Sequence, residues 1–167
     1  MIAATTTPVD HDPRSDSPGV TLMPPAIFLT CLAVGAVLEF LLPRGFPLLP
    51  VPLRALLGLG IGGAGLALML VAHEQFQRIG TNVPTDLPAT RLVRRGAYKL
   101  SRNPMYVGGS TFFLGIALAV GSLWLLAACV PLGLYLALYV IPREEAYMER
   151  AFGDDYRAYC RIVRRWL

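Results

Sequence analysis

The sequence predicts an all-α fold: an integral membrane bundle of four transmembrane helices, followed by an amphipathic helical tail. Composition supports this fold class, because 54% of the 167 residues are hydrophobic and the mean hydropathy is +0.52. Charged residues make up only 16% of the chain, below the roughly 25% of a soluble domain, and they are gathered into blocks. These values exclude a disordered chain and disfavour an ordinary soluble domain.

The chain begins with a polar stretch, residues 1–24, which is rich in Thr, Pro, Asp and Ser. We expect a flexible N-terminal tail here. The stretch lacks the basic start and the early apolar run of a signal peptide. Residues 25–167 are then expected to form a single membrane domain.

Four apolar segments follow the N-terminal tail. They lie at about 25–43, 53–76, 104–120 and 123–142. Each is long enough, at about 1.5 Å per residue, to cross a hydrocarbon core of about 30 Å, although the third is near the short limit. Only Gly121 and Ser122 separate the last two segments, which predicts a tight helical hairpin. The proline-rich stretch 43–52 is not expected to be helical.

The distribution of basic residues predicts the orientation. Lys and Arg are concentrated in the 73–106 loop and in the tail 143–167, whereas the loop between the first two segments has only Arg44 and Arg54. By the positive-inside rule, both basic blocks and both chain termini face the cytoplasm. Basic loops beside an anionic leaflet also explain the net charge of +4, so no nucleic-acid partner is expected.

The tail 143–167 predicts two helices, with Gly153 ending the first and Asp154 capping the second. Aromatic and apolar residues recur at helical spacing on one face of this tail, and arginines occupy the other. The apolar face consists of Phe152, Tyr156, Tyr159, Cys160, Val163 and Trp166. Such a helix lies on the membrane surface or packs against the bundle.

Three further patterns in the sequence bear on function. The segment GIGGAG at 60–65 matches a dinucleotide-binding pattern, but it lies within an apolar helix and follows no strand. Glycines four residues apart, such as Gly58 and Gly62, instead predict close helix packing and permit a homodimer.

Glu39, near the outer end of its segment, is either a functional residue or one that reaches the interface. The three cysteines have no zinc spacing, and no metal site is expected.

The segment SRNPMY, at 101–106, places polar residues at the start of the third apolar helix. Asn103 is a suitable N-cap, and Pro104 suits the first helical position. Capping does not explain Arg102 and Tyr106, which lie at the mouth of the same helix, with Tyr98 preceding them.

A second polar group, Arg143-Glu144-Glu145, follows the fourth apolar segment. The hairpin brings its end beside the start of the third segment, close to Arg102 and Tyr106. The contact between the two groups predicts either a simple interfacial ion pair or a polar binding site.

The segment from residue 76 onward resembles the isoprenylcysteine carboxyl methyltransferase family, a wider group that includes phospholipid N-methyltransferases. The family signature is Arg-His-Pro-x-Tyr-x-Gly, an apolar hairpin, Glu-Glu, and a Phe-Gly-x-x-Tyr-x-x-Tyr tail. The matching positions here are Arg102, Asn103, Pro104, Tyr106 and Gly108, then Glu144 and Glu145, then Phe152, Gly153, Tyr156 and Tyr159.

The resemblance implies a membrane methyltransferase that uses S-adenosylmethionine in a cytoplasmic pocket. The implied cofactor-site residues are Tyr98, Arg102, Asn103, Pro104, Tyr106, Gly108, Glu144 and Glu145, and the implied catalytic residues are Arg102, Arg143 and Tyr106. Asn103 replaces the family's histidine. Because asparagine can form hydrogen bonds but cannot titrate, we expect this residue to position or cap.

The implied acceptor is a lipophilic small molecule or a lipid-like molecule of the membrane. A carboxylate acceptor, as in the isoprenylcysteine enzymes, needs a cation to hold it and no base, and it is the favoured expectation. An amine or thiol acceptor would instead need a proton acceptor. A non-catalytic membrane scaffold and a small transporter are further hypotheses.

Overall fold

The computed structural model describes residues 17–45, 49–80 and 91–167. The described residues form an all-helical fold with no β-strand beyond an isolated bridge between Gly45 and Ser122. The elements are α1 (Pro24–Leu41), α2 (Val51–Ile79), a 3-10 helix η2 (Gly96–Lys99), α3 (Pro104–Val120), α4 (Leu123–Tyr135), a π-helix η3 (Leu136–Val140) and α5 (Ile141–Ile162).

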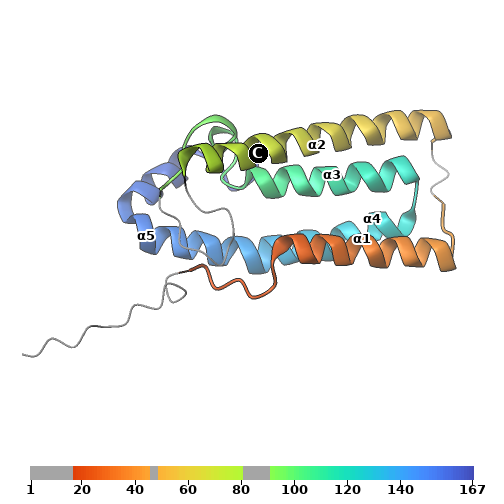
Figure 1. The fold of residues 1–167 in the computed structure, drawn as a ribbon, viewed down its shortest axis with the longest axis horizontal. Coiled ribbons are helices and arrows are strands. Elements are labelled where there is room, and N and C mark those ends of the chain that lie inside the picture. Colours follow the sequence, from red (N-terminus) through yellow and green to blue (C-terminus); the bar gives the residue numbers. More distant parts are fainter. Residues whose placement is uncertain (1–16, 46–48, 81–90) are drawn as a thin grey trace, which may run out of the picture.

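The helices form two antiparallel pairs, α2 with α3 and α1 with α4, as Figure 1 shows. Gly121, with φ +73°, ends α3, and the Ser122 hydroxyl caps α4 by accepting from the Leu125 backbone. This confirms the predicted hairpin. The helix that begins as α4 continues without a break through η3 into α5, which carries the chain beyond the bundle.

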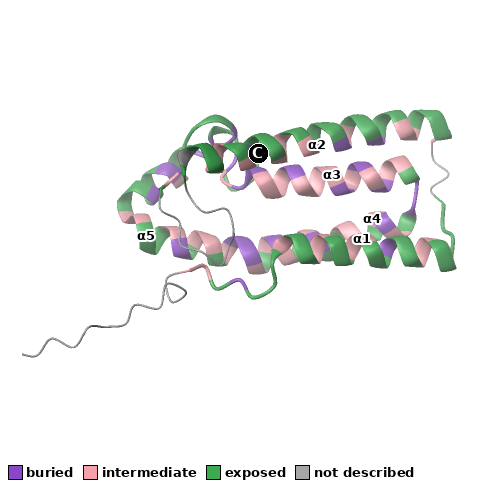
Figure 2. Ribbon diagram, viewed as in Figure 1, coloured by how far each residue is buried: buried purple, intermediate pink, exposed green. Residues whose placement is uncertain are grey.

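Three helical stretches of the described chain are long and apolar enough to cross a membrane: Pro24–Leu41, Val51–Arg78 and Leu123–Ile162. The apolar helix α3 is shorter, with 17 residues. Large apolar side chains lie exposed on the outer faces of the bundle, for example Phe40 at 85% and Leu59 at 70% (Figure 2). Exposed apolar area on this scale is typical of a lipid-facing surface.

Glycines set the distance between α2 and α3. A Cβ added at Gly58 would lie 2.4 Å from the Ala119 nitrogen, and one added at Gly115 would lie 2.3 Å from the Gly62 Cα. Only residues without side chains allow such an approach. The predicted packing role of Gly58 and Gly62 is confirmed. Because their face is buried against α3, a homodimer would need another surface.

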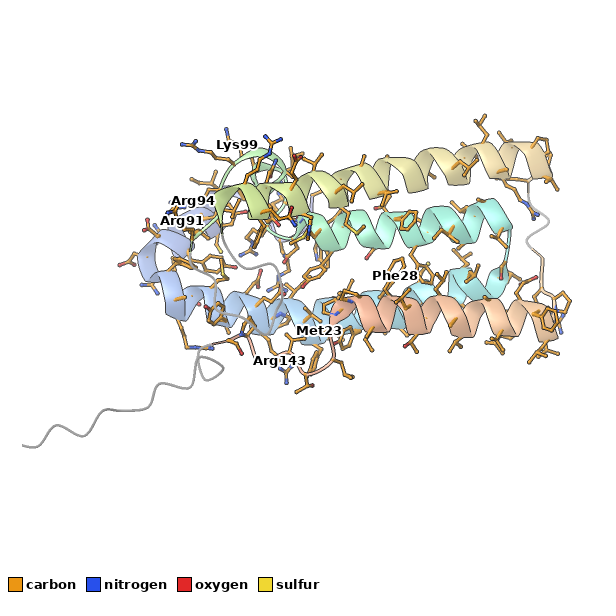
Figure 3. The ribbon with its side chains drawn as sticks, viewed as in Figure 1. Met23, Phe28, Arg91, Arg94, Lys99 and Arg143 are labelled. Atoms are coloured by element: carbon orange, nitrogen blue, oxygen red, sulfur yellow. The ribbon has the colours of Figure 1, made fainter. Side chains whose placement is uncertain are left out.

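The two helix pairs meet at an aromatic cluster. The Phe28 ring of α1 lies between the pairs (Figure 3), with its centroid 5.2 Å from that of Phe113 and 6.2 Å from that of Phe112. Phe113 is fully buried, and Val140 lies in the same core. Edge-to-face ring packing of this kind joins the pairs without a polar contact.

Residues 17–23 of the expected N-terminal tail pack against the fourth apolar segment. Val20 is only 5% exposed and lies in the main core cluster. The Thr21 hydroxyl pairs with that of Tyr139 at 2.9 Å, and the Tyr135 hydroxyl donates to the Leu22 carbonyl. This part of the predicted tail therefore has a defined place, and residues 1–16 lie outside the described residues.

Glu39 lies at the hairpin end of the molecule. Its carboxylate accepts a hydrogen bond of 2.6 Å from the Ser122 hydroxyl, at the turn between α3 and α4. The nearby Trp124 indole donates to the Leu42 carbonyl at 2.7 Å. Glu39 thus joins α1 to the turn, at the end of the bundle opposite α5.

Candidate active site

The start of α3 differs from the expected cap. Asn103 has the N-cap position and Pro104 the first helical position, but the Asn103 side chain makes no capping hydrogen bond. Its amide donates instead to the Arg165 carbonyl at 3.1 Å, and its backbone N–H donates to the Ser101 hydroxyl at 3.0 Å. The capping alternative is wrong, because the returning tail offers an acceptor to the buried amide. Asn103 positions the tail.

The C-terminal tail folds back onto the segment before α3. Gly153, with φ +52° and ψ −124°, breaks α5 as predicted, since this backbone conformation favours glycine. The Tyr159 hydroxyl then donates to the Tyr98 carbonyl at 2.7 Å, and the Arg102 backbone N–H donates to the Arg164 carbonyl at 2.9 Å. Of the two expected placements for this tail, the structure has the one packed against the bundle.

Two details of the tail differ from the prediction. The Asp154 carboxylate accepts from the Arg157 guanidinium at 2.7 Å, and no cap by Asp154 is seen. Trp166 lies beyond the helix end and is 40% exposed. The rest of the predicted apolar face is packed, with Tyr156, Tyr159 and Val163 buried in one cluster.

Arg102 and Glu145 form a largely buried ion pair. The Arg102 Nη2 lies 3.2 Å from the Glu145 Oε1, and the two side chains are 16% and 15% exposed. The other Glu145 oxygen accepts from the Arg165 guanidinium at 2.5 Å, and the Arg102 Nη1 lies 2.7 Å from the Cys160 sulfur. Glu145 thus holds two cations at once, and the loss of one buried partner would leave uncompensated charge.

A hollow of about 560 Å³ adjoins this ion pair. Its volume falls in the range of about 300–1,000 Å³ that is usual for small-molecule sites. The polar side chains that line it are Arg102, Glu145, Glu149, Tyr156, Arg157, Cys160, Arg161 and Arg165. Within the described ranges, no three His, Cys, Asp or Glu side chains are grouped to hold a metal ion.

Glu144 faces a different environment. Its carboxylate accepts a hydrogen bond from the Tyr106 hydroxyl, and Tyr106 packs against the main apolar core. Glu144 lies just beyond the end of the fourth apolar segment. Burial raises the pKa of its carboxyl to about 7, with the negative charge of Glu145 adding to the effect and the bond from Tyr106 opposing it.

The remaining predicted cofactor residues lie near the start of α3. Tyr98 is 5% exposed, and its ring packs against Phe76 with centroids 5.1 Å apart. Pro104 is buried at the base of α3. Gly108 faces α2 rather than the hollow, because a Cβ added there would lie 2.6 Å from the Gly65 carbonyl oxygen.

Arg143 lies apart from the other predicted residues. Its guanidinium carbon is 3.8 Å from the centroid of the Tyr139 ring, and its Nη1 donates to the Tyr139 carbonyl at 3.3 Å. In Figure 3 it lies on the side of Met23, away from Arg94 and Lys99. A catalytic role for Arg143 therefore requires an acceptor that reaches this side of α5.

Comparisons with known proteins identify the family of this chain. The model of the phospholipid methyltransferase family matches residues 53–155, more than half of the chain. The chain belongs to the phospholipid methyltransferase family. A protein of Haemophilus influenzae described as uncharacterized is 42% identical over 57 residues, which cover 31% of this chain and 90% of that protein. No solved structure matches.

The family assignment confirms the resemblance stated above and makes this chain a membrane methyltransferase. The matched region contains the α3 start and the Glu144–Glu145 pair, and it ends before the returning segment 156–165. The sequence predicted that Tyr156 and Cys160 pack on the apolar face of the tail and that Arg165 belongs to its basic face. It placed none of the three in the site, although all three line the hollow. The helical spacing of apolar residues in the tail indicated that one face is buried. It did not indicate which polar groups beside that face line the hollow.

Proposed function

We propose that this protein transfers a methyl group from S-adenosylmethionine to a lipophilic acceptor at the membrane surface. The observation that carries the proposal is the largely buried Arg102–Glu145 pair beside a hollow, in a chain of the phospholipid methyltransferase family. When bound, S-adenosylmethionine supplies a methyl group on a positively charged sulfur, which an acceptor attacks in line.

The residues around the hollow suit such a cofactor. Glu145 already accepts two guanidinium groups, so its carboxylate is suited to a ligand ammonium. Glu149 offers a further acceptor, and the Tyr156 ring offers an aromatic surface for a base or a cation. Arg102 holds Glu145 in place, which preorganises the site before any ligand enters.

Titration with S-adenosylhomocysteine by calorimetry tests the proposal. We expect saturable binding to the wild type. We expect the dissociation constant to rise roughly tenfold or more in Arg102→Ala and Glu145→Gln, because each variant loses a charge-assisted contact. Arg78→Ala is the matched control, since Arg78 pairs only with Glu74 on the exposed surface of α2 among the described residues. Absence of binding, or equal binding in all variants, would favour a non-catalytic scaffold.

The acceptor class is a separate part of the proposal. The resemblance to isoprenylcysteine enzymes favours a carboxylate, held by Arg102 or Arg143. A specific observation favours an amine instead: Glu144, on the core side, has a carboxylate bonded to Tyr106 and no Lys or Arg partner among the described ion pairs. An anionic acceptor would be repelled there, whereas an ammonium would be attracted.

Product chemistry separates the two acceptors. Membranes containing the protein would be incubated with donor labelled in its methyl group, and the lipid extract would then be treated with base. A methyl ester releases its label as volatile methanol, whereas an N-methyl group keeps it. Label that appears only when the protein is present identifies the acceptor class, and label equal to that in a Glu145→Gln membrane would contradict enzymatic transfer.

A further inference from the structure

The end of the C-terminal tail lies beside the segment that leads into α3. The Arg102 backbone N–H donates to the Arg164 carbonyl at 2.9 Å, and the Ser101 hydroxyl donates to the Arg165 carbonyl at 3.1 Å. These bonds hold residues 162–167 close to the bundle. Accordingly, the C-terminus in Figure 1 lies near the start of α3 and not at the tip of α5. Two segments that are far apart in sequence therefore form one surface.

Large apolar side chains are exposed on both of these segments. Ile162 is 84% exposed, Leu100 is 64% exposed and Trp166 is 40% exposed. Each of them lies within two residues, along the chain, of a residue that makes the hydrogen bonds between the segments. We call these three residues the tail patch. A group of exposed apolar side chains is typical of a surface that contacts a protein partner or a membrane.

The tail patch lies close to the level at which α3 enters the membrane. Helix α3 has 17 residues, so its length is about 25 Å, less than the hydrocarbon core of about 30 Å. The first residue of this span, Pro104, therefore lies at or within the edge of the hydrocarbon, and Leu100 precedes it by only four residues. Tryptophan is enriched at this depth, because its ring is apolar and its N–H is polar.

Two exposed cations accompany the tail patch. Lys99 and Arg164 are each next to or between its members in sequence. Within the part of the chain that the structure describes, neither takes part in an ion pair, whereas the neighbouring Arg102 and Arg165 both pair with Glu145. Cations beside apolar side chains at a membrane boundary suit negatively charged lipids, because the apolar groups enter the hydrocarbon edge and the cations reach the phosphates.

We propose that the tail patch, together with Lys99 and Arg164, docks on anionic phospholipid headgroups of the leaflet at this end of the bundle. None of these five residues is among the described residues that line the hollow, so the surface is distinct from the candidate active site. The level of the patch favours lipid over a soluble partner, which would not need it at the membrane boundary. Because the same segment bonds to Arg102 and Asn103, docking also holds the tail against the start of α3.

Tryptophan fluorescence in lipid nanodiscs tests this proposal with the full-length protein. The chain has two tryptophans, so Trp124→Phe leaves Trp166 as the single reporter. Brominated lipids quench a tryptophan that they contact. We expect brominated phosphatidylcholine and brominated phosphatidylglycerol both to quench Trp166. We expect the anionic lipid to reach half-quenching at a mole fraction roughly fivefold lower, because each cation near an anionic surface adds to the attraction.

Charge-neutral variants show whether the two cations cause the preference. In the double variant Lys99→Gln/Arg164→Gln, we expect the difference between the two lipids to disappear, and in Lys99→Gln alone to shrink. Arg150→Gln is the matched control and is expected to keep the full difference, since Arg150 is an exposed arginine of α5 before the Gly153 break. The Arg164 substitution leaves its backbone carbonyl in place, so the bond from Arg102 is retained.

Three outcomes would overturn the proposal. Absence of quenching by either lipid would mean that the tail patch faces water or a protein. Equal quenching by the two lipids would remove the preference for anionic headgroups. A preference that persists in the double variant, with thermal unfolding equal to that of Arg150→Gln, would show that other charges cause it. None of these results affects the methyltransferase assignment.

Discussion

Asn103 explains how this chain departs from the family signature without losing the local structure. The family's histidine and this asparagine each offer an N–H donor from a short side chain. Here the donor reaches the Arg165 carbonyl and ties the tail to the start of α3. In this chain the position therefore supplies a hydrogen bond and no titratable group.

Substitutions at Asn103 test whether its hydrogen bond or its shape stabilises the fold. Asn103→Ala removes one of two donors to the Arg165 carbonyl, the other being the Ser101 hydroxyl at 3.1 Å. We expect a loss of about 1 kcal/mol in unfolding free energy. Asn103→His retains a donor, so we expect it to lose less. Thermal unfolding of both variants in detergent measures the difference. If histidine destabilises as much as alanine, shape rather than hydrogen bonding decides this position.

At the scale of elements, the α2–α3 pair is the most closely packed part of the bundle. Backbone meets backbone at Gly58, Gly62, Gly65, Gly108 and Gly115. The pair positions the start of α3, and with it Arg102 and Tyr106, against the rest of the site. Its close packing therefore affects the geometry of the site as well as stability.

Alanine substitutions test this packing. Gly115→Ala would place a methyl group 2.3 Å from the Gly62 Cα, and we expect the helices to separate at a cost of about 1–3 kcal/mol. Gly63→Ala is the matched control, because nothing lies within 4 Å of its added Cβ. Chemical unfolding in detergent is expected to show a loss for the first variant only. Equal effects would mean that helix propensity, not interhelical contact, is being measured.

At the scale of the whole molecule, the labelled basic residues gather at one end. Arg91, Arg94, Lys99 and Arg143 all lie toward α5 and away from the hairpin turn (Figure 3). The positive-inside rule predicts that this end faces the cytoplasm. That orientation would let the hollow meet a water-soluble cofactor while the apolar faces of the bundle contact lipid.

Reporter fusions test the orientation. Alkaline phosphatase, which is active only outside the cytoplasm, is expected to be active when fused after Arg44 and inactive when fused after Leu167. Green fluorescent protein after Leu167 is expected to fluoresce. The reverse pattern would place the hollow on the outer side and contradict a cytoplasmic cofactor.

Much of this architecture could be predicted from the sequence, because apolar periodicity, prolines and glycines act locally. They indicated the four apolar helices, the Gly121 turn, the Gly153 break and the meeting of Arg102 with Glu145. Periodicity could not indicate that Val20 enters the core. That contact depends on the path of the non-helical segment before α1, which hydrophobic spacing does not determine.

The break at Gly153 has a consequence for the length of α5. Each helical residue turns the chain by about 100°, so the stretch from Glu145 to Gly153 sets the direction in which the tail returns. One inserted residue there would leave both halves helical but swing Tyr159 away from the Tyr98 carbonyl. The number of residues between Glu145 and Gly153 is therefore fixed by the contact that Tyr159 makes at the far end of the tail.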